Sequence, residues 1–153
     1  MAESHQYRIV AWWSAGRTGL AKSDSAPSSI HFAAPPQFGG LEGRWTPEDL
    51  LLCAVASCFT TTFRVLAEYS KWDYPDLQVE AQGTVDKLES GYGFTRIVLR
   101  PHLKIFEAEE RAHALSLLRK AEGLCLVSRS LAVPQTFDPV VEVASVSAPE
   151  GRH

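Results

Sequence analysis

Residues 46–63 read TPEDLLLCAVASCFTTTF, and this stretch carries the clearest structural signal of the chain. Thr46 can cap a helix, the proline after it suits the first helical position, and the two carboxylates that follow favour the positive end of the helix dipole. No side chain in 50–63 is charged, and the helix is expected to continue to about Tyr69. A helix that is apolar on every face is buried. The stretch therefore predicts a central helix that the rest of the protein, or a second copy of it, covers.

The segment before this helix predicts a small antiparallel sheet. Residues 7–13 are rich in β-branched and aromatic types, which is typical of a strand. A turn with two glycines around Arg17 follows, and weaker strands are expected at about 20–24 and 29–32. Residues 34–44 contain Pro-Pro and Gly-Gly pairs and predict a loop that leads into the helix.

The segment after the helix predicts a long hairpin, a second helix and a last strand. Residues 77–88 and 94–106 are expected to be the two strands of the hairpin, because polar and apolar side chains alternate in 77–88. Pro101 suggests an edge or bulge position in the second strand. The remaining elements are an amphipathic helix over 107–122, which Gly123 is expected to cap, and a strand over 137–146.

Length and composition indicate one ordinary α+β domain. A chain of 153 residues fits a single domain over 1–153, with an ordered core at about 7–146 and a frayed tail at 148–153. Apolar types make up 45% and charged types 22%, which excludes a disordered or fibrous chain. With 15 basic against 18 acidic residues, the net charge of −3 argues against a strongly basic nucleic-acid binder.

The sequence predicts a cytoplasmic protein that is not a membrane protein. The first residues are polar and lack the apolar region of a signal peptide. The uncharged run of 14 residues at 50–63 is shorter than the ~20 that a membrane-spanning helix needs. In the cytoplasm thiols are normally reduced, so each cysteine is either a small core residue or a reactive group.

Three cysteines are too few, and odd in number, for a disulfide scaffold. The five histidines have no metal-ligand spacing, and no metal site or phosphate-binding loop is expected. Cys58, in the middle of the predicted central helix, is either a core residue or a nucleophile. Cys53 lies ~140° around the same helix, and we expect it to pack in the core. Cys125 lies just beyond the predicted helix cap, where it can be partly exposed and mobile.

Several separated motifs resemble the OsmC/Ohr family of thiol-dependent peroxidases. The resemblance covers the chain from about Tyr7 to Val146. It favours Cys58 as a nucleophile over Cys58 as a core residue. The motifs are Ser14-Ala-Gly-Arg-Thr-Gly, Phe38-Gly-Gly, Trp45-Thr-Pro-Glu-Asp-Leu-Leu, Ala56-Ser-Cys-Phe and Glu122-Gly-Leu-Cys-Leu-Val-Ser.

The resemblance implies a role for four residues. Cys58 matches the peroxidatic cysteine, Cys125 the resolving cysteine, Arg17 the arginine of a glycine-flanked loop and Glu48 the glutamate after the helix-opening proline. Leu-Val-Ser follows Cys125, whereas the organic-hydroperoxide subgroup has Pro-Tyr-Ser. This departure favours the broader OsmC-like branch.

The resemblance also implies an assembly. The OsmC-like fold wraps antiparallel sheets around a long buried central helix, and the family forms an intertwined homodimer with active sites at the interface. Glu48 and Cys58 are ten residues apart, which is ~15 Å along a helix. Two central helices that cross antiparallel about a two-fold axis would bring each Glu48 near the other chain's Cys58.

The implied reaction is the reduction of hydroperoxides to alcohols, which protects against oxidative stress. A Cys58 sulfenic acid would condense with Cys125 to a disulfide, and an external dithiol, a lipoylated protein or a small thiol, would reduce it without a bound cofactor. Burial raises a thiol pKa, whereas the Arg17 guanidinium would favour the thiolate. Glu48 would hold Arg17 in a bidentate pair, or else only favour the helix dipole. The apolar residues around Cys58 favour an organic hydroperoxide over hydrogen peroxide.

Two readings from other classes stay open. The same dimer could be a binding module for a small apolar ligand, with Cys58 and Cys125 as structural residues. Alternatively, the two cysteines could cycle as a redox sensor without peroxide turnover. Peroxide consumption by wild type, Cys58→Ser and Cys125→Ser distinguishes these readings.

Overall fold

The computed structural model describes residues 3–145, in two compact units of which one ends at Leu51 and the other begins at Leu52. The predicted frayed tail, 148–153, and the end of the predicted last strand at Val146 lie outside the described residues. One antiparallel sheet, a second sheet built on an antiparallel hairpin, and a long helix make up the fold, as the sequence predicts for an α+β protein. The α+β class is therefore confirmed.

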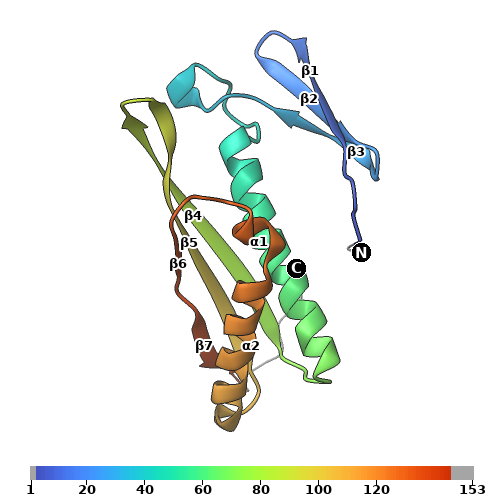
Figure 1. Ribbon diagram of the computed structural model, residues 1–153, viewed down its shortest axis with the longest axis vertical. Helices are drawn as coiled ribbons and strands as arrows, with labels where there is room; N and C mark the ends of the chain where they lie inside the picture. Colours follow the sequence, from blue (N-terminus) through green and yellow to red (C-terminus); the bar gives the residue numbers. More distant parts are fainter. Residues whose placement is uncertain (1–2, 146–153) are drawn as a thin grey trace. The chain divides into compact units, whose positions relative to one another are not determined.

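The first unit contains a three-stranded antiparallel sheet in the order β1-β2-β3 (Figure 1). The three predicted strands are confirmed, although each begins or ends a few residues away from its expected position. Every residue of β1 is exposed. The elements are β1 (Ile9–Ala15), β2 (Thr18–Ser23), β3 (Ala26–Phe32) and the short helix η1 (Pro36–Phe38).

The predicted central helix is α1 (Pro47–Tyr69), the longest helix of the described residues. Thr46 caps it, because the Thr46 Oγ1 accepts a hydrogen bond from the Asp49 N–H at 3.0 Å. The Asp49 carboxylate in turn accepts from the Thr46 N–H at 3.0 Å, which completes a capping box. The start that the sequence predicts is therefore confirmed together with its physical cause.

The burial of α1 differs from the prediction. Only one stripe is buried, formed by Val55, Phe59, Phe63 and Ala67, whose spacing of four places them on one helix face. The opposite face is open to solvent, and Val65 on it is 49% exposed. By length and composition α1 could also cross a membrane, but its buried stripe belongs to the core of a folded unit. Within the second unit the core therefore covers one stripe of α1, and the cover of the remaining faces by a second copy stays a prediction.

The second unit is built on a long antiparallel hairpin of β4 (Asp76–Leu88) and β5 (Gly91–Ile105). On its other side β5 pairs in parallel with two short strands, β6 (Gln135–Phe137) and β7 (Val140–Val143). The prediction of one last strand over 137–146 is therefore wrong, because Asp138 and Pro139 separate two strands.

Pro101 lies inside this sheet, so the prediction of an edge or bulge is also wrong. It pairs with Val79 of β4 and is fully buried. On the other side of β5, the pairing with β6 ends at Leu99 and the pairing with β7 begins at His102. Pro101 lies in the unpaired gap between them. A residue without an N–H therefore interrupts neither parallel ladder.

The predicted amphipathic helix consists of η2 (Ala108–Glu110) and α2 (Arg111–Leu124), followed by the short helix α3 (Leu126–Arg129). The sequence predicts that Gly123 caps the helix. This prediction is wrong, because Gly123 lies inside α2. The break falls at Cys125, whose extended backbone (φ −64°, ψ 106°) ends α2 and begins α3. Cys125 therefore lies at the junction between two helices.

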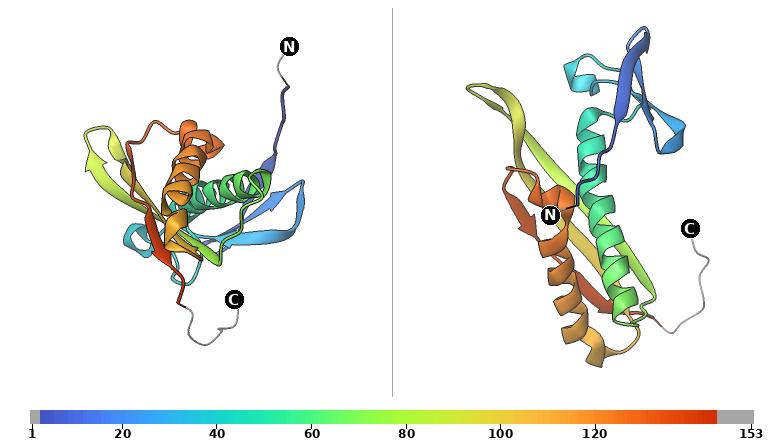
Figure 2. Two further views of the ribbon diagram at one scale, coloured as in Figure 1. Left: turned by 90° about the horizontal axis from the view of Figure 1, so that it is seen from below. Right: turned by 45° about the vertical axis from the view of Figure 1, so that its right-hand side comes forward.

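The core of the second unit lies between one face of the sheet and the two long helices. Helices α1 and α2 lie side by side across β4 and β5 (Figures 1 and 2). The Phe59 ring lies 6.3 Å from the Phe63 ring and 5.9 Å from the Phe137 ring, centre to centre. The fully buried members of the cluster are Val55, Phe59, Phe63, Ala67, Leu103, Ile105, Ala114, Leu118, Ala121 and Cys125.

Candidate active site

Two cysteines from distant parts of the sequence meet in the second unit. Cys58 lies on α1 next to the buried stripe and is partly buried, and Cys125 lies at the junction of α2 and α3 and is fully buried. Their side chains are close enough for each to shift the pKa of the other, and both are free thiols. The pair that the family resemblance implies is therefore brought into contact by the packing of the two helices on the sheet.

The surroundings of Cys58 favour its thiolate. Partial burial raises the pKa of Cys58, but the backbone N–H of Val127, the Cys125 thiol, the backbone N–H of Leu126 and the Thr62 side chain all lower it. The hydrogen bonds outweigh the burial, and the pKa lies below its ordinary value. Cys58 therefore forms the nucleophilic thiolate more readily than a free cysteine does.

The surroundings of Cys125 act in the opposite direction. Burial is the largest cause and raises the pKa of Cys125, the side chain and backbone of Ser128 lower it, and the neighbouring Cys58 raises it by a smaller amount. The pKa of Cys125 therefore lies above its ordinary value, and Cys125 stays a thiol that donates its hydrogen bond to Cys58. When surroundings push the pKa values of two neighbouring groups apart, the two groups take different chemical roles.

The backbone of α3 supplies N–H donors to Cys58. The first N–H groups of a helix have no partner within it, so those of Leu126 and Val127 are free to bind the sulfur. The position of α3 is fixed by Gln135, whose Nε2 donates to the Ser128 carbonyl at 2.9 Å. Sequence motifs could not reveal these donors, because they belong to the backbone. The only signal would have been the helix break at Cys125, which the sequence analysis placed at Gly123.

The exposure of two cysteines differs from the predictions. Cys125 is not partly exposed but completely buried, because α2 continues through Gly123 and carries it into the core. Cys53 does not pack in the core but is exposed, because it lies on the side of α1 away from the buried stripe. Cys53 is therefore the most accessible of the three cysteines, and Cys125, which was expected to be partly exposed, is buried.

Arg17 lies in the tight turn between β1 and β2 of the first unit. Gly16 provides the positive φ of 56° that this turn needs, and the Trp13 indole N–H donates to the Gly16 carbonyl at 2.8 Å. The Arg17 guanidinium is exposed and donates to the Gly39 carbonyl through Nη1. The predicted glycine-flanked arginine loop is therefore present as a turn.

Glu48 lies in the first turn of α1, where its charge favours the helix dipole. Its Oε1 atom is buried, and no hydrogen-bond partner for it occurs among residues 3–145. No ion pair with Arg17 is formed in this part of the chain either. Ten residues of helix separate Glu48 from Cys58, about 15 Å, so Glu48 cannot contact the cysteine of its own chain.

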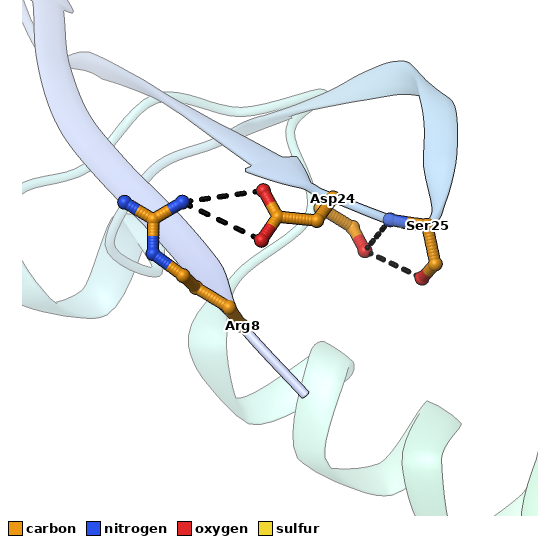
Figure 3. Close-up of polar contacts among 4 residues, drawn as sticks. Arg8, Asp24 and Ser25 are labelled. Carbon is orange, nitrogen blue, oxygen red and sulfur yellow. Dashed lines mark hydrogen bonds and ion pairs between the residues drawn. The ribbon is translucent and has the colours of Figure 1, made fainter. Parts of the chain in front are cut away.

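Other parts of the described chain show little sign of chemistry. No cluster of three or more His, Cys, Asp or Glu side chains that could hold a metal occurs within residues 3–145. A shallow hollow in the first unit is lined by Arg8, Asp24 and their neighbours. Arg8 donates to Asp24 there at 3.2 Å (Figure 3), but both side chains are exposed, and such a pair contributes only ~0–1 kcal/mol.

Comparison with known proteins now places the chain in a family. The family model described as OsmC-like protein matches residues 40–139, which include Glu48, Cys58 and Cys125. This chain is an OsmC-like protein. Among the relatives of this OsmC-like chain is YmaD of Bacillus subtilis (strain 168), which is 28% identical over 134 residues that cover 86% of this chain and 89% of YmaD.

Solved structures show the same fold. The OsmC-like protein VCA0330 of Vibrio cholerae superposes with a TM-score of 0.79 at 17% identity, over 90% of this chain and 100% of that one. An organic hydroperoxide resistance protein of Elizabethkingia anophelis superposes with a TM-score of 0.74 at 22% identity, over 94% and 100% of the two chains. At these identities the similarity concerns the fold, and the OsmC-like fold that the sequence motifs predict is confirmed.

Proposed function

We propose that this OsmC-like protein is a thiol-dependent peroxidase that reduces organic hydroperoxides to alcohols. The carrying observation is the contact between Cys58 and Cys125, whose pKa values are lowered and raised respectively. A cysteine peroxidase of this kind needs a thiolate that attacks the peroxide and a second thiol that stays protonated until the sulfenic acid has formed. The different environments of the two cysteines favour these two states. The structural similarity to proteins named for organic hydroperoxide resistance supports the substrate class.

The first step is the attack of the Cys58 thiolate on the peroxide. Its sulfur attacks one oxygen of ROOH, an S–O bond forms, the O–O bond breaks, and the alkoxide leaves as ROH after it takes a proton. Cys58 becomes a sulfenic acid. The N–H groups of Leu126 and Val127 stabilise the thiolate before the attack, which raises the fraction of reactive sulfur at neutral pH.

The second step uses the neighbouring thiol. The Cys125 sulfur attacks the Cys58 sulfur, an S–S bond forms, and the hydroxyl leaves as water with the proton of Cys125. An external dithiol, on a lipoylated protein or a small molecule, then reduces the disulfide by two exchange reactions. Burial of Cys125 protects it from direct oxidation. We place this cycle in the cytoplasm, where such reductants keep thiols reduced.

The surface beside Cys58 suits an organic substrate. The sequence analysis expects the apolar residues around Cys58 to favour an organic hydroperoxide. Two of them, Val55 and Phe59, are fully buried in the core and cannot line a substrate site. Leu126, whose N–H binds Cys58, instead has a side chain that is 68% exposed. We therefore expect a higher initial rate with cumene hydroperoxide than with hydrogen peroxide. An equal or lower rate would argue against this preference.

We further propose that Arg17 and Glu48 complete the site in a homodimer. A guanidinium beside the sulfur favours the thiolate and can donate to the peroxide oxygens as charge develops. Two observations support a contribution from a second chain: the open face of α1, and the buried Glu48 Oε1 without a partner in residues 3–145. A bidentate pair with an arginine would satisfy this oxygen.

Peroxide consumption with dihydrolipoamide tests the reaction. Cys58→Ser should abolish turnover, and Cys125→Ser should allow a first turnover and then lose activity. Cys53→Ser is the matched control and should retain the wild-type rate, because Cys53 is exposed and outside the pair. A Cys58→Ser variant with wild-type turnover would exclude the peroxidase and favour a binding module. Disulfide formation with diamide but no peroxide consumption would favour a redox sensor.

Co-expression of two inactive variants tests the shared site. Cys58→Ser and Glu48→Ala are each expected to be inactive alone. In a mixed dimer, the Cys58 of one chain meets the intact Glu48 of the other, so about a quarter of the wild-type activity should return if the two chains pair at random. A mixture that remains inactive, or a fully active monomer in ultracentrifugation, would contradict the shared site.

A further inference from the structure

The hydroxyl of Ser128 is the one buried polar group of the cysteine site that the reaction described above does not use. Ser128 lies on α3 three residues after Cys125, which places both on one side of this short turn. Its Oγ is buried and makes no well-formed hydrogen bond to any atom of residues 3–145. Buried hydroxyl groups normally have a partner, so this one needs an explanation.

The backbone around Ser128 is firmly held, so the buried hydroxyl is not the result of a loose segment. The Ser128 carbonyl accepts from the Gln135 amide at 2.9 Å and from the Leu131 N–H at 3.2 Å. The Cys125 carbonyl accepts from the Arg129 N–H at 3.0 Å, which closes the turn between them. These contacts hold the hydroxyl beside the Cys125 sulfur.

A thiol is a poor acceptor for this hydroxyl, whereas a thiolate is a good one. The Ser128 side chain lowers the pKa of Cys125 against the larger upward effect of burial. The titratable group that faces Cys125 from α1 is Cys58, which raises its pKa. The hydroxyl thus has its best partner only when Cys125 loses its proton, which happens when Cys125 attacks.

We propose that Ser128 is a positioning residue for the resolving step, with a hydroxyl that stabilises negative charge on Cys125 as it attacks the Cys58 sulfenic acid. This inference rests on the proposed peroxidase function. In the step, the Cys125 S–H bond breaks, the Cys58–Cys125 bond forms, and the Cys58 S–O bond breaks. The hydroxide takes the proton and leaves as water. Ser128 donates a hydrogen bond throughout and is unchanged at the end.

The test separates the two chemical steps with one equivalent of cumene hydroperoxide and no reductant. Sulfenic acid is trapped with dimedone at successive times, and disulfide and sulfinic acid are measured by intact mass. In Ser128→Ala we expect sulfenic acid to form at the wild-type rate and to resolve about ten-fold more slowly. The rate of resolution should also reach its midpoint at higher pH, and excess peroxide should yield more sulfinic acid.

Two variants serve as controls for this test. Ser130→Ala removes an exposed hydroxyl of the same segment, which donates to the Leu126 carbonyl at 2.9 Å, and should resolve at the wild-type rate. Ser128→Thr keeps the hydroxyl and should restore most of the rate. Wild-type resolution in Ser128→Ala, or an equal loss in Ser130→Ala, would overturn the inference. Wild-type protein that forms no sulfenic acid at all would instead overturn the proposed function.

Discussion

Leu126→Pro removes one N–H donor from the Cys58 sulfur and leaves the side chain apolar. Proline suits the first position of a helix, which Leu126 occupies in α3. It also requires an extended residue before it, and Cys125 has φ −64° and ψ 106°. The substitution therefore fits the backbone, and its main effect should be on the thiolate.

The expected magnitude follows from the lost hydrogen bond. A hydrogen bond to a charged group contributes ~1.5–3 kcal/mol when buried, and we take about 1 kcal/mol because Cys58 is partly open to solvent. Loss of the bond raises the pKa of Cys58, and below that pKa the free energy corresponds to about a five-fold smaller fraction of thiolate. The reactive form is the thiolate, whose fraction increases with pH. Below the pKa, Leu126→Pro should therefore react about five-fold more slowly, and at high pH the rates should converge.

The assay is the single-turnover rate of cumene hydroperoxide reduction between pH 5 and pH 9, in a Cys53→Ser background so that only the paired cysteines react. Leu126→Ala is the control, because it removes the exposed side chain but keeps the N–H, and its midpoint should stay at the wild-type pH. Circular dichroism confirms that each variant is folded. A folded Leu126→Pro with an unchanged midpoint would refute the assignment of α3 as the source of thiolate stabilisation.

Three further predictions concern stability and are measured by urea unfolding. Phe63→Ala should cost ~3–5 kcal/mol because its ring is fully buried between α1 and the sheet, whereas Tyr69→Ala, at an 84% exposed position of the same helix, should stay within ~0.5 kcal/mol. Gly40→Ala should destabilise the protein by at least ~1–3 kcal/mol, because a Cβ there would overlap the Ala34 carbonyl. Gly123→Ala should stabilise it by ~0.5–1 kcal/mol, because Gly123 lies inside α2 with open space around it; any loss of stability there would contradict the placement of the helix end.

The sequence predicts those parts of the fold that local chemistry determines. The cap at Thr46, the long helix α1 and the hairpin of β4 and β5 all follow from residue types and their alternation. The parallel pairing of β6 and β7 with β5 does not, because it joins segments far apart in the chain through backbone hydrogen bonds. The sequence does not reveal the place of Pro101 in the sheet for the same reason, since its partner there, Val79, is far from it in the chain.

The candidate site was predictable only in part. Motif resemblance identifies Cys58 and Cys125, and the structure brings them together. The motifs cannot predict that backbone N–H groups of α3 contact Cys58, because every residue type except proline carries a backbone N–H. The sequence predicts a buried Cys53 and a partly exposed Cys125, and the structure shows the opposite. The exposure of each depends on which helix face meets the sheet, and an apolar run without charges does not mark that face.

The most direct test of the proposed cysteine pair is a map of the oxidised thiols. Wild-type protein is treated with one equivalent of cumene hydroperoxide, alkylated at once, digested without reduction and analysed by mass spectrometry. The proposed cycle predicts a peptide pair linked through Cys58 and Cys125, with Cys53 alkylated in high yield although it is the exposed cysteine. Three alkylated thiols after exposure to peroxide, or oxidation of Cys53 ahead of Cys58, would contradict it.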